Sequence, residues 1–398
     1  MGALALAFMI GGKVSPAAAQ RAIDVDLLLV LFALLTAVEI LRQSGYLDLI
    51  VALTVSRFTT TRAFALALIA LSGVLASLVT NDVTLFIVIP FTVVASRFSD
   101  FDVEDAVVLE IVATNLVGCL TPLGNPQNLF VFHRSGWSAA HFMRVMLPFV
   151  IWSIAGLLAA LFLLGRSRVM TKTTVNLPPR DRVAAIAGAI CFAFVLLEIA
   201  RVMSAWPAAV AALLSAAVFL RRRVFRVDYS IVPLFFFAFI VVEGLRSLNL
   251  YRGGAHLYAS SILLSQVISN VPATVLLSPM AGGDWRTLLY GVNAGGCGTI
   301  IASLANLLGW RIYVRESNRD PRFFRRLTLI NFAFLAWIAV GGYVIATSPR
   351  SDRVPREARR PASSSASSAR SPLPTRASSR VAPSAAPRTN PSSDRIHR

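Results

Sequence analysis

The chain has 398 residues, of which 56% are hydrophobic and 15% are charged, and its formal net charge is +18. A mean hydropathy of +0.67 reflects more apolar side chains than one soluble core can bury, which excludes an ordinary soluble enzyme or binding module. The composition predicts an all-α polytopic membrane protein. Its three cysteines lie in apolar sequence, so we expect no disulfide framework.

The chain opens with a short apolar segment from Ala3 to Ile10. This segment is too short to cross a membrane. Small residues follow it, as they do in a signal peptide, but Lys13 comes after the apolar run and the cationic region that should precede the run is missing. We therefore expect a shortened first transmembrane helix and not a cleaved leader.

Six further apolar runs are long enough, or nearly so, to cross about 30 Å of hydrocarbon at about 1.5 Å per helical residue. They are Leu27–Leu41, Phe142–Leu164, Val183–Ile199, Ala208–Leu220, Ile231–Leu245 and Leu327–Ala346.

Two other parts of the chain are apolar sequence interrupted by polar residues, and the polar residues of the two parts follow one another in the same order. The first copy has Thr80-Asn81-Asp82 and then the run 115–129, and the second has Ser269-Asn270 and then the run 293–307. One constant shift superposes Asn115 on Asn293, Gly118 on Gly296, Cys119 on Cys297, Thr121 on Thr299 and Asn128 on Asn306.

A third matching pair lies upstream, where residues 38–42 and 242–246 both read Val-Glu-x-Leu-Arg. Glu39 and Glu243 each precede an arginine by three residues, the spacing of an ion pair on one helix face, so we expect them to support the scaffold. Three ordered matches indicate an internal duplication. Polar breaks in corresponding places of two membrane halves predict a substrate and ion site between the repeats, because broken backbone facing lipid would leave costly unpaired amides.

Basic residues gather in short loops, which marks those loops as cytoplasmic. The loops contain Arg166, Arg168, Lys172, Arg180 and Arg182, then Arg221, Arg222, Arg223 and Arg226, then Arg311, Arg315, Arg319, Arg322, Arg325 and Arg326. With these loops inside, residues 63–95 and 255–280 form hairpins that enter from opposite sides, and residues 107–132 and 286–310 form broken helices. The predicted fold is two inverted repeats, each with a re-entrant helical hairpin and a broken transmembrane helix.

The expected division of the chain follows from these repeats. Residues 1–165 form the first repeat, 166–182 a cytoplasmic linker, 183–347 the second repeat and 348–398 a Ser/Pro/Ala/Arg-rich tail. The tail contains eleven arginines and three carboxylates, and its low complexity predicts disorder. Helix parity places it on the outer side of the membrane, opposite to the cytoplasmic basic loops, and we interpret it as an extension and not as a nucleic-acid-binding arm.

Four segments of the sequence resemble motifs of the ion-transporter superfamily. The resemblance is carried by TNDVTLFIVIP (80–90), TPLGNPQN (121–128), SNVPATVLL (269–277) and GTIIASLAN (298–306). These segments are similar to motifs of three branches: arsenical pump membrane proteins, sodium/proton antiporters of the NhaD kind, and divalent anion:sodium symporters with a citrate-transporter-like domain. The similarity extends over nearly the whole chain, from Leu4 to about Ala346.

The resemblance implies a binding site at the two hairpin tips. In the symporter branch, tips and broken-helix carbonyls hold sodium and the facing tips hold the anion. By position this implies sodium ligands at Thr80, Asn81 and Gly118, with Thr121 beside them, and at Ser269, Asn270 and Gly296, with Thr299 beside them. The wider substrate- and ion-binding set adds Asp82, Thr84, Gly124, Asn125, Thr274, Gly298 and Ser303. Asp82 and Val271 stand where the symporters have threonine and are closer to the arsenical-pump pattern, which leaves the substrate class open.

The residue chemistry supports the same site independently. Unwound carbonyls and hydroxyls are hard oxygen donors for a small cation, and half-helix amino ends suit an anion. An ionised Asp82 at membrane depth is costly unless it is paired, protonated or cation-bound. Asp82 is therefore a candidate cation ligand or proton carrier, or else a structural cap. We expect Asn128 and Asn306 to bond carbonyls freed by the breaks, and Cys119 and Cys297 to pack and not to bind a metal.

The function predicted from these features is secondary active transport of a small anion, an inorganic oxyanion or a carboxylate, coupled to sodium or protons across the plasma (inner) membrane. The resemblance implies elevator-type alternating access and a homodimer. The alternatives are an arsenite/antimonite-type efflux permease, a cation/proton antiporter and a non-transporting membrane scaffold. No His-Glu-x-x-His, Gly-x-Ser-x-Gly or Walker motif occurs, so we expect no enzyme activity, no catalytic residue and no cofactor beyond sodium as coupling ion.

Overall fold

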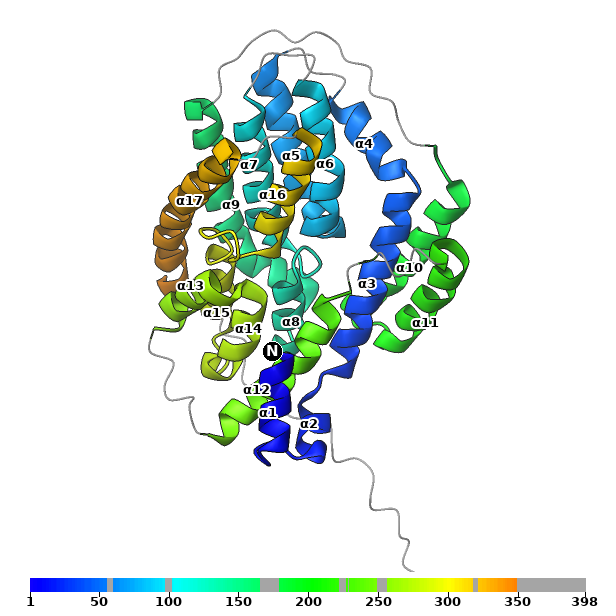
Figure 1. Ribbon diagram of the computed structural model, residues 1–398, viewed down its shortest axis with the longest axis vertical. Coiled ribbons are helices and arrows are strands. Elements are labelled where there is room, and N and C mark those ends of the chain that lie inside the picture. The colour runs from blue at the N-terminus through cyan, green and yellow to red at the C-terminus, as the bar shows by residue number, and fades with distance from the viewer. Residues whose placement is uncertain are drawn as a thin grey trace, which may run out of the picture. The chain divides into compact units, whose positions relative to one another are not determined.

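The computed structural model describes residues 1–55, 60–96, 102–164, 179–221, 227, 229–248, 256–317 and 321–348. These residues are folded into helices, with no strand among them (Figure 1), which confirms the predicted all-α class. Met1–Ser348 form one compact unit. The predicted tail, most of the predicted linker and the arginines at 222, 223, 226 and 319 lie outside the described residues.

The helices follow one another with short connections. The first half of the chain contains α1 (Gly2–Ile10), α2 (Pro16–Ala22), α3 (Val25–Gln43), α4 (Tyr46–Val55), α5 (Thr61–Val79), α6 (Asn81–Ser96), α7 (Val103–Leu116), η1 (Gly118–Leu120), α8 (Pro126–Ser135) and α9 (Ala139–Leu164). The second half contains α10 (Arg182–Ile199), α11 (Ala205–Ser215), η2 (Ala216–Leu220), α12 (Ile231–Ser247), α13 (Leu257–Ile268), α14 (Asn270–Leu277), η4 (Ser278–Ala281), α15 (Trp285–Ala294), α16 (Leu304–Ser317) and α17 (Pro321–Thr347).

The six apolar runs predicted as spans all fall on helices, namely α3, α9, α10, α11 with η2, α12 and α17. Both predicted hairpins are pairs of helices, α5 with α6 and α13 with α14. Their arms are unequal, because α5 has 19 residues whereas α13 has 12 and α14 has 8. In the described part of the chain, α5, α9, α10 and α17 are long and apolar enough to cross a membrane. The short helix α4 was not predicted.

Acidic side chains fix the starts of several helices, because a carboxylate just before a helix can accept an otherwise unpaired backbone N–H. Asp24 Oδ1 accepts the N–H of Leu27 at 3.1 Å at the start of α3. Asp181 Oδ1 accepts the N–H of Ala184 at 3.0 Å at the start of α10. The hydropathy pattern alone cannot locate these boundaries.

Helices from both halves of the chain pack together in a first group. In it α3 lies against α10 and α11, and α12 lies against α1 and α2 (Figure 1). The contact between α3 and α10 is close, since a Cβ at Gly188 would lie 2.9 Å from Leu41 Cγ. The predicted ion pair within α3 is present, with Arg42 Nη2 2.7 Å from Glu39 Oε1.

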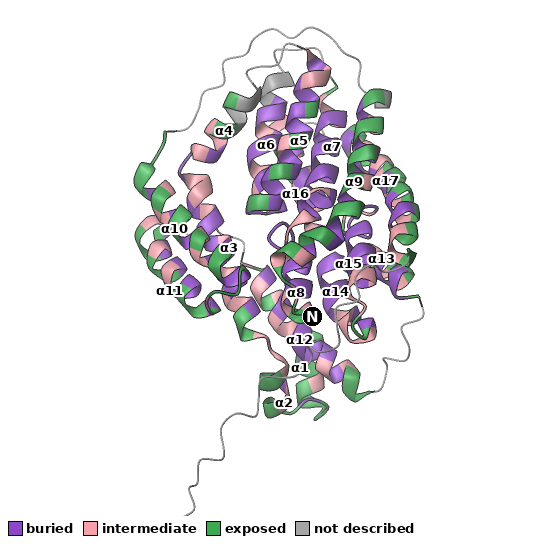
Figure 2. Ribbon diagram, turned by 180° about the vertical axis from the view of Figure 1, so that it is seen from behind, coloured by how far each residue is buried: buried purple, intermediate pink, exposed green. Residues whose placement is uncertain are grey.

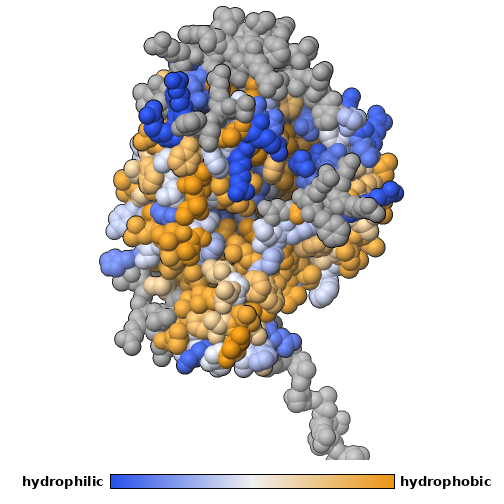
Figure 3. Space-filling view, viewed as in Figure 1, coloured by the Kyte–Doolittle hydropathy of each residue, from blue (hydrophilic) through white to orange (hydrophobic). Residues whose placement is uncertain are grey.

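The second group consists of the two hairpins, the broken helices and the helices α9 and α17. Within it α7, α14 and α15 are largely buried (Figure 2). On the outer surface, hydrophobic side chains cover much of the visible face (Figure 3). Leu263, Val267 and Val340 are 67%, 68% and 66% exposed. Such a surface is stable in a bilayer and not in water, so the protein is a multi-pass membrane protein.

A reciprocal contact joins α9 to α17, the last helix of each predicted repeat. The indole rings of Trp152 and Trp337 stack with centroids 4.3 Å apart and an interplanar angle of 6°. Each indole N–H donates to the backbone oxygen of the other tryptophan, at 3.1 and 3.2 Å. The two residues are 185 apart, and the same shift superposes Gly156 on Gly341, whose missing side chains leave room for these indoles. This further match escaped the sequence analysis because it has no polar break.

We predict that Gly341→Ala lowers the thermal midpoint of the purified protein, because its Cβ would lie 1.9 Å from Trp152 Nε1. Overpacking of this kind costs about 1 to 3 kcal/mol. The measurement is thermal unfolding in detergent. The control is Val340→Ala on the same helix, which is exposed and should change stability by about 0.5 kcal/mol or less. Equal midpoints for the two variants would contradict the close tryptophan contact.

Candidate ion and substrate site

Each hairpin turns at a residue other than glycine in a left-handed conformation. Thr80, between α5 and α6, has φ 113°, and Ser269, between α13 and α14, has φ 75°. Such backbone costs of the order of 1 to 3 kcal/mol and persists only where its surroundings hold it. Hydroxyls on the following turns bond the tip backbone, Thr84 Oγ1 to Thr80 O at 2.8 Å and Thr274 Oγ1 to Asn270 O at 2.6 Å. These two predicted site threonines therefore stabilise the tips.

Each tip is also bonded to the loop of a broken helix from its own half of the chain. The N–H of Asn81 donates to Gly124 O at 3.1 Å, and the N–H of Asn270 donates to Ala302 O at 2.8 Å. The constant shift of the sequence analysis superposes Gly124 on Ala302, so the same bond is made twice. The predicted site residue Gly124 must be glycine, because a Cβ there would lie 1.8 Å from Gly118 O.

A second pair of bonds fastens the loops to the first arms of the hairpins. Thr121 Oγ1 donates to Ser77 O at 2.5 Å, and Thr299 Oγ1 donates to Gln266 O at 3.0 Å. The amide of Gln266 also donates to Gly295 O at 2.9 Å. The predicted residues Thr121 and Thr299 thus have their hydroxyls occupied by backbone. Ser77 and Gln266 were missed because they precede the breaks.

The breaks themselves lie where predicted, between α7 and α8 and between α15 and α16. Asn128 Nδ2 donates to Cys119 O at 3.0 Å and to Thr121 O at 3.3 Å. In the second half, Asn306 Nδ2 donates to Gly296 O at 2.9 Å and to Thr299 O at 3.2 Å. The prediction that these two asparagines bond carbonyls freed by the breaks is confirmed.

The same two asparagines connect the halves to each other. Asn115 Nδ2 donates to Asn306 Oδ1 at 2.9 Å, and Asn293 Nδ2 donates to Asn128 Oδ1 at 2.9 Å. All four side chains are buried. Exchange of the two halves converts one bond into the other, as expected for duplicated elements that face one another. Ser303 adds to this contact, since its hydroxyl donates to Asn115 Oδ1 at 2.9 Å.

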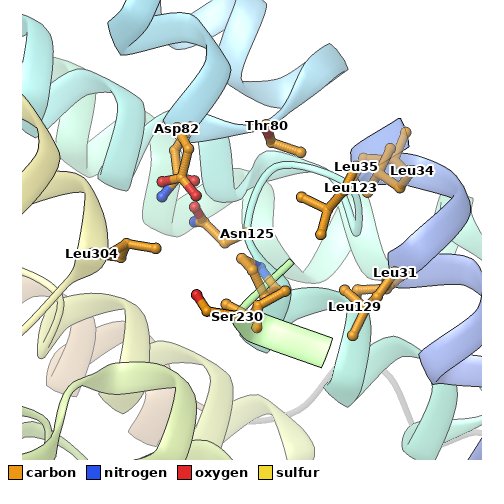
Figure 4. Close-up of a pocket in the computed structure, with 13 residues that line it drawn as sticks. Leu31, Leu34, Leu35, Thr80, Asp82, Leu123, Asn125, Leu129, Ser230 and Leu304 are labelled. Carbon is orange, nitrogen blue, oxygen red and sulfur yellow. The ribbon is translucent and has the colours of Figure 1, made fainter. Parts of the chain in front are cut away.

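A small cavity of about 30 Å³ lies at the first tip. Thr80, Asn81, Asp82 and Asn125 line it together with the following residues of α3 and of the first broken helix: Leu31, Leu34, Leu35, Leu123 and Leu129. Figure 4 shows Asp82 and Asn125 next to each other, with these five leucines on one side and Leu304 on the other. This volume suits one water molecule or one small cation, whereas sites for organic ligands occupy about 300 Å³ or more.

Three buried oxygens at this cavity, Thr80 Oγ1, Asn81 Oδ1 and Asn125 Oδ1, have no hydrogen-bond partner among the described residues. An unsatisfied buried polar atom costs about 1 to 3 kcal/mol. Hydroxyl and amide oxygens are the hard ligands that small cations prefer, and the carboxylate of Asp82 lines the same cavity. The oxygen ligands of this cavity therefore fit a cation such as sodium.

The second tip is arranged differently. Ser269 and Asn270 do not line this cavity, and Ser269 Oγ donates to Ala302 O at 3.4 Å. A Cβ at Gly296 would lie 2.9 Å from Asn270 Nδ2, and Gly298, with φ 108°, is pressed against Gln266. Of the first set of predicted ligands, Thr80 and Asn81 line the cavity, whereas Gly118 and Thr121 are not among its lining residues. Gly118 packs against α5 instead, where a Cβ would lie 2.8 Å from Ala76 Cβ. Gly296 and Gly298 of the second set allow close packing.

A buried carboxylate, Glu110 in α7, was also missed, because it lies in an apolar stretch before the break and has no counterpart motif in the sequence. Its side chain is fully buried, and Oε1 lies 2.6 Å from Thr92 Oγ1. Thr92 Oγ1 is also 3.1 Å from Val88 O. Thr92 Oγ1 donates to Glu110 Oε1, and Glu110 Oε2 has no hydrogen-bond partner among the described residues. The arrangement suits a carboxyl group that is neutral in the membrane.

Comparisons with known proteins support a transport role. The family described as Citrate transporter matches residues 1–284. The uncharacterized transporter MJ0456 of Methanocaldococcus jannaschii is 35% identical over 322 residues, 78% of this chain and 86% of that protein. The inner membrane protein YbiR of Escherichia coli is 31% identical over 340 residues, 83% of this chain and 90% of that protein. The uncharacterized transporter Rv2684 of Mycobacterium tuberculosis is 26% identical over 332 residues, 72% and 77% of the two chains.

A double-mutant cycle should detect the bond between Asn115 and Asn306. Each change to alanine is expected to lower the free energy of unfolding by about 1 to 3 kcal/mol, because the partner is left unsatisfied and buried. The double variant should lose less than the sum of the single losses, by about 0.5 to 3 kcal/mol. Chemical denaturation in detergent measures these values, and additive losses would show that the two side chains do not interact.

Proposed function

This chain belongs to the citrate transporter family and is a plasma-membrane transporter, and we propose that it moves a small carboxylate or oxyanion together with a coupling cation bound at the first hairpin tip. The observation that supports the cation site is the set of unpaired buried oxygens of Thr80, Asn81 and Asn125 at one small cavity. A cation held there would satisfy these oxygens and offset the charge of the anion.

At the hairpin tips the substrate would bind in another state of the protein, since a cavity of about 30 Å³ cannot hold a carboxylate such as citrate. Three leucines of α3, Leu31, Leu34 and Leu35, close one side of the first tip. We therefore propose that the hairpins and broken helices move as a unit against the group formed by α3, α10 and α11. This motion would expose the tips alternately to the two sides of the membrane.

The proposed motion agrees with the way the two halves are joined. Hydrogen bonds link each tip to a broken helix, and the paired asparagines link the broken helices to each other. The hairpins and breaks can then move together without exposing freed carbonyls to lipid. The reciprocal stack of Trp152 on Trp337 is the contact that a two-fold axis between inverted repeats would produce.

A second candidate function is proton-coupled transport, in which no sodium is needed. The buried Glu110 beside Thr92 favours it, because a carboxyl group that is neutral in the membrane can bind and release a proton during transport. Asp82 at the first tip is the other carboxylate suited to this role.

Sodium should raise the thermal midpoint of the wild-type protein relative to choline, since a ligand that binds only the folded state stabilises it. Asn81→Ala and Asn125→Ala should abolish this increase and sodium-driven anion uptake into proteoliposomes. The control is Asn331→Ala, which removes a buried asparagine of α17 that does not line the cavity. A sodium-dependent increase that survives in both cavity variants would refute the site.

If the tip carboxylate handles protons, Asp82→Asn should remove the pH dependence of anion uptake while the protein still folds. Glu110→Gln is the comparison, because it keeps the shape of the other buried carboxyl group. Uptake is measured in proteoliposomes over a series of pH values. Loss of pH dependence only in Glu110→Gln would assign the proton to α7, and an unaltered profile in both variants would exclude proton handling by either residue.

A further inference from the structure

We propose that a second, larger cavity, formed by α2, α8, α12 and α14, is an anion-binding site that captures oxyanions before they reach the hairpin tips. Its ligand would be a small polyanion that presents carboxylate or phosphate groups. Binding at this cavity is independent of the first-tip cation, whereas its role in delivering substrate rests on the proposed function.

The cavity has a volume of about 580 Å³, within the range of about 300 to 1,000 Å³ found for small-molecule sites. Three helices each contribute one arginine to its lining, Arg21 from α2, Arg134 from α8 and Arg246 from α12. Glu243 is the carboxylate among the lining residues. The described lining therefore has a net positive charge, which attracts anions.

The three guanidinium groups have donors to spare. Among the described residues, Arg134 comes no closer than 3.9 Å to Asp24, and Arg246 no closer than 4.0 Å to Glu243. Arg21 donates from Nε to its own helix, to Ala17 O at 3.2 Å. The arginine of α3 shows the contrast, since Arg42 donates to both oxygens of Glu39 at 2.8 and 2.7 Å. A planar guanidinium without such a partner can bind a carboxylate or a phosphate bidentately.

Arg134 is held in position for this task. Its guanidinium carbon lies 5.8 Å from the ring centre of Phe130 and 5.3 Å from that of Phe239, and Nη2 donates to Ala22 O at 3.4 Å. Stacking on two rings restricts the side chain before any ligand arrives, which lowers the entropy lost on binding. The rings also give the cavity an apolar wall for the carbon skeleton of a ligand.

Helix α8 (Figure 1) connects this cavity to the first tip. Pro126 and Leu129 line the tip cavity, while Phe130 and Arg134 line the arginine cavity. From Pro126 to Arg134 the helix rises about 12 Å at about 1.5 Å per residue. An anion held by the arginines therefore needs to travel only a short distance along one helix. The predicted topology places this cavity on the outer side of the membrane, where substrate for uptake would arrive.

The test is calorimetric titration of citrate into the full chain in nanodiscs of phosphatidylcholine, with choline as the cation so that sodium is absent. Wild-type protein should bind citrate, and its affinity should fall as salt rises. Arg21→Gln combined with Arg246→Gln should weaken binding about tenfold or more. The control is Arg144→Gln combined with Arg182→Gln, which removes two exposed arginines outside the cavity and should leave the affinity within about twofold.

Asn81→Ala separates this proposal from the proposed function, because it should leave citrate binding intact while sodium-driven uptake is lost. Citrate binding that disappears in Asn81→Ala would assign the anion to the tip and overturn the arginine site. Equal affinity in the wild type and the cavity double variant, or no binding by the wild type, would also overturn it. A third outcome concerns phosphatidylglycerol that co-purifies with the protein. If the wild type retains this lipid, the double variant loses it, and neither protein binds citrate, the occupant is a lipid headgroup and capture of a free anion is refuted.

Discussion

The crossed hydrogen bonds between Asn115 and Asn306 and between Asn293 and Asn128 are the contact on which the rest of the structure depends. A transmembrane helix can be interrupted only where its freed backbone groups find partners inside the protein. Asn128 and Asn306 supply those partners, since their amide nitrogens bond the broken backbone of their own half and their oxygens accept from the other half. The same two asparagines therefore stabilise the helix breaks and join the two halves of the chain.

Once the breaks are held in this way, the two hairpin tips can turn at strained residues and bond the loops through Asn81 and Asn270. The resulting site is symmetric in its backbone and asymmetric in its side chains. At the first tip, Thr80, Asn81 and Asn125 have buried oxygens without hydrogen-bond partners among the described residues, and they line a cavity together with Asp82. At the second tip, the hydroxyl of Ser269 donates to Ala302 O. The repeated sequence accounts for the matching backbone bonds of the two tips, and the side-chain differences between the copies account for the unpaired oxygens at the first tip.

Much of the fold could be predicted because polar residues at membrane depth must find partners inside the protein, and therefore mark helix breaks, turns and ion pairs. The breaks around Gly118 and Gly296, the hairpin turns before Asn81 and Asn270, and the ion pair of Glu39 with Arg42 all follow from that rule. Contacts made by side chains that suit any apolar helix could not be predicted. Trp152 and Trp337 look like ordinary lipid-facing residues until their stacking is seen, and Glu110 is distinguished only by its burial. Thr80, Asn81, Asp82 and Asn125 of the first-tip cavity were among the predicted residues, but the difference between the tips depends on which hydrogen bonds are already made.

The most direct test of the cation site is a high-resolution cryo-electron microscopy map of the protein in sodium, compared with a map in choline under otherwise equal conditions. We predict density between the side-chain oxygens of Thr80, Asn81 and Asn125 in sodium, with the same position empty in choline. Identical density at this position in both maps, or sodium-dependent density at Ser269 and Asn270 alone, would contradict it.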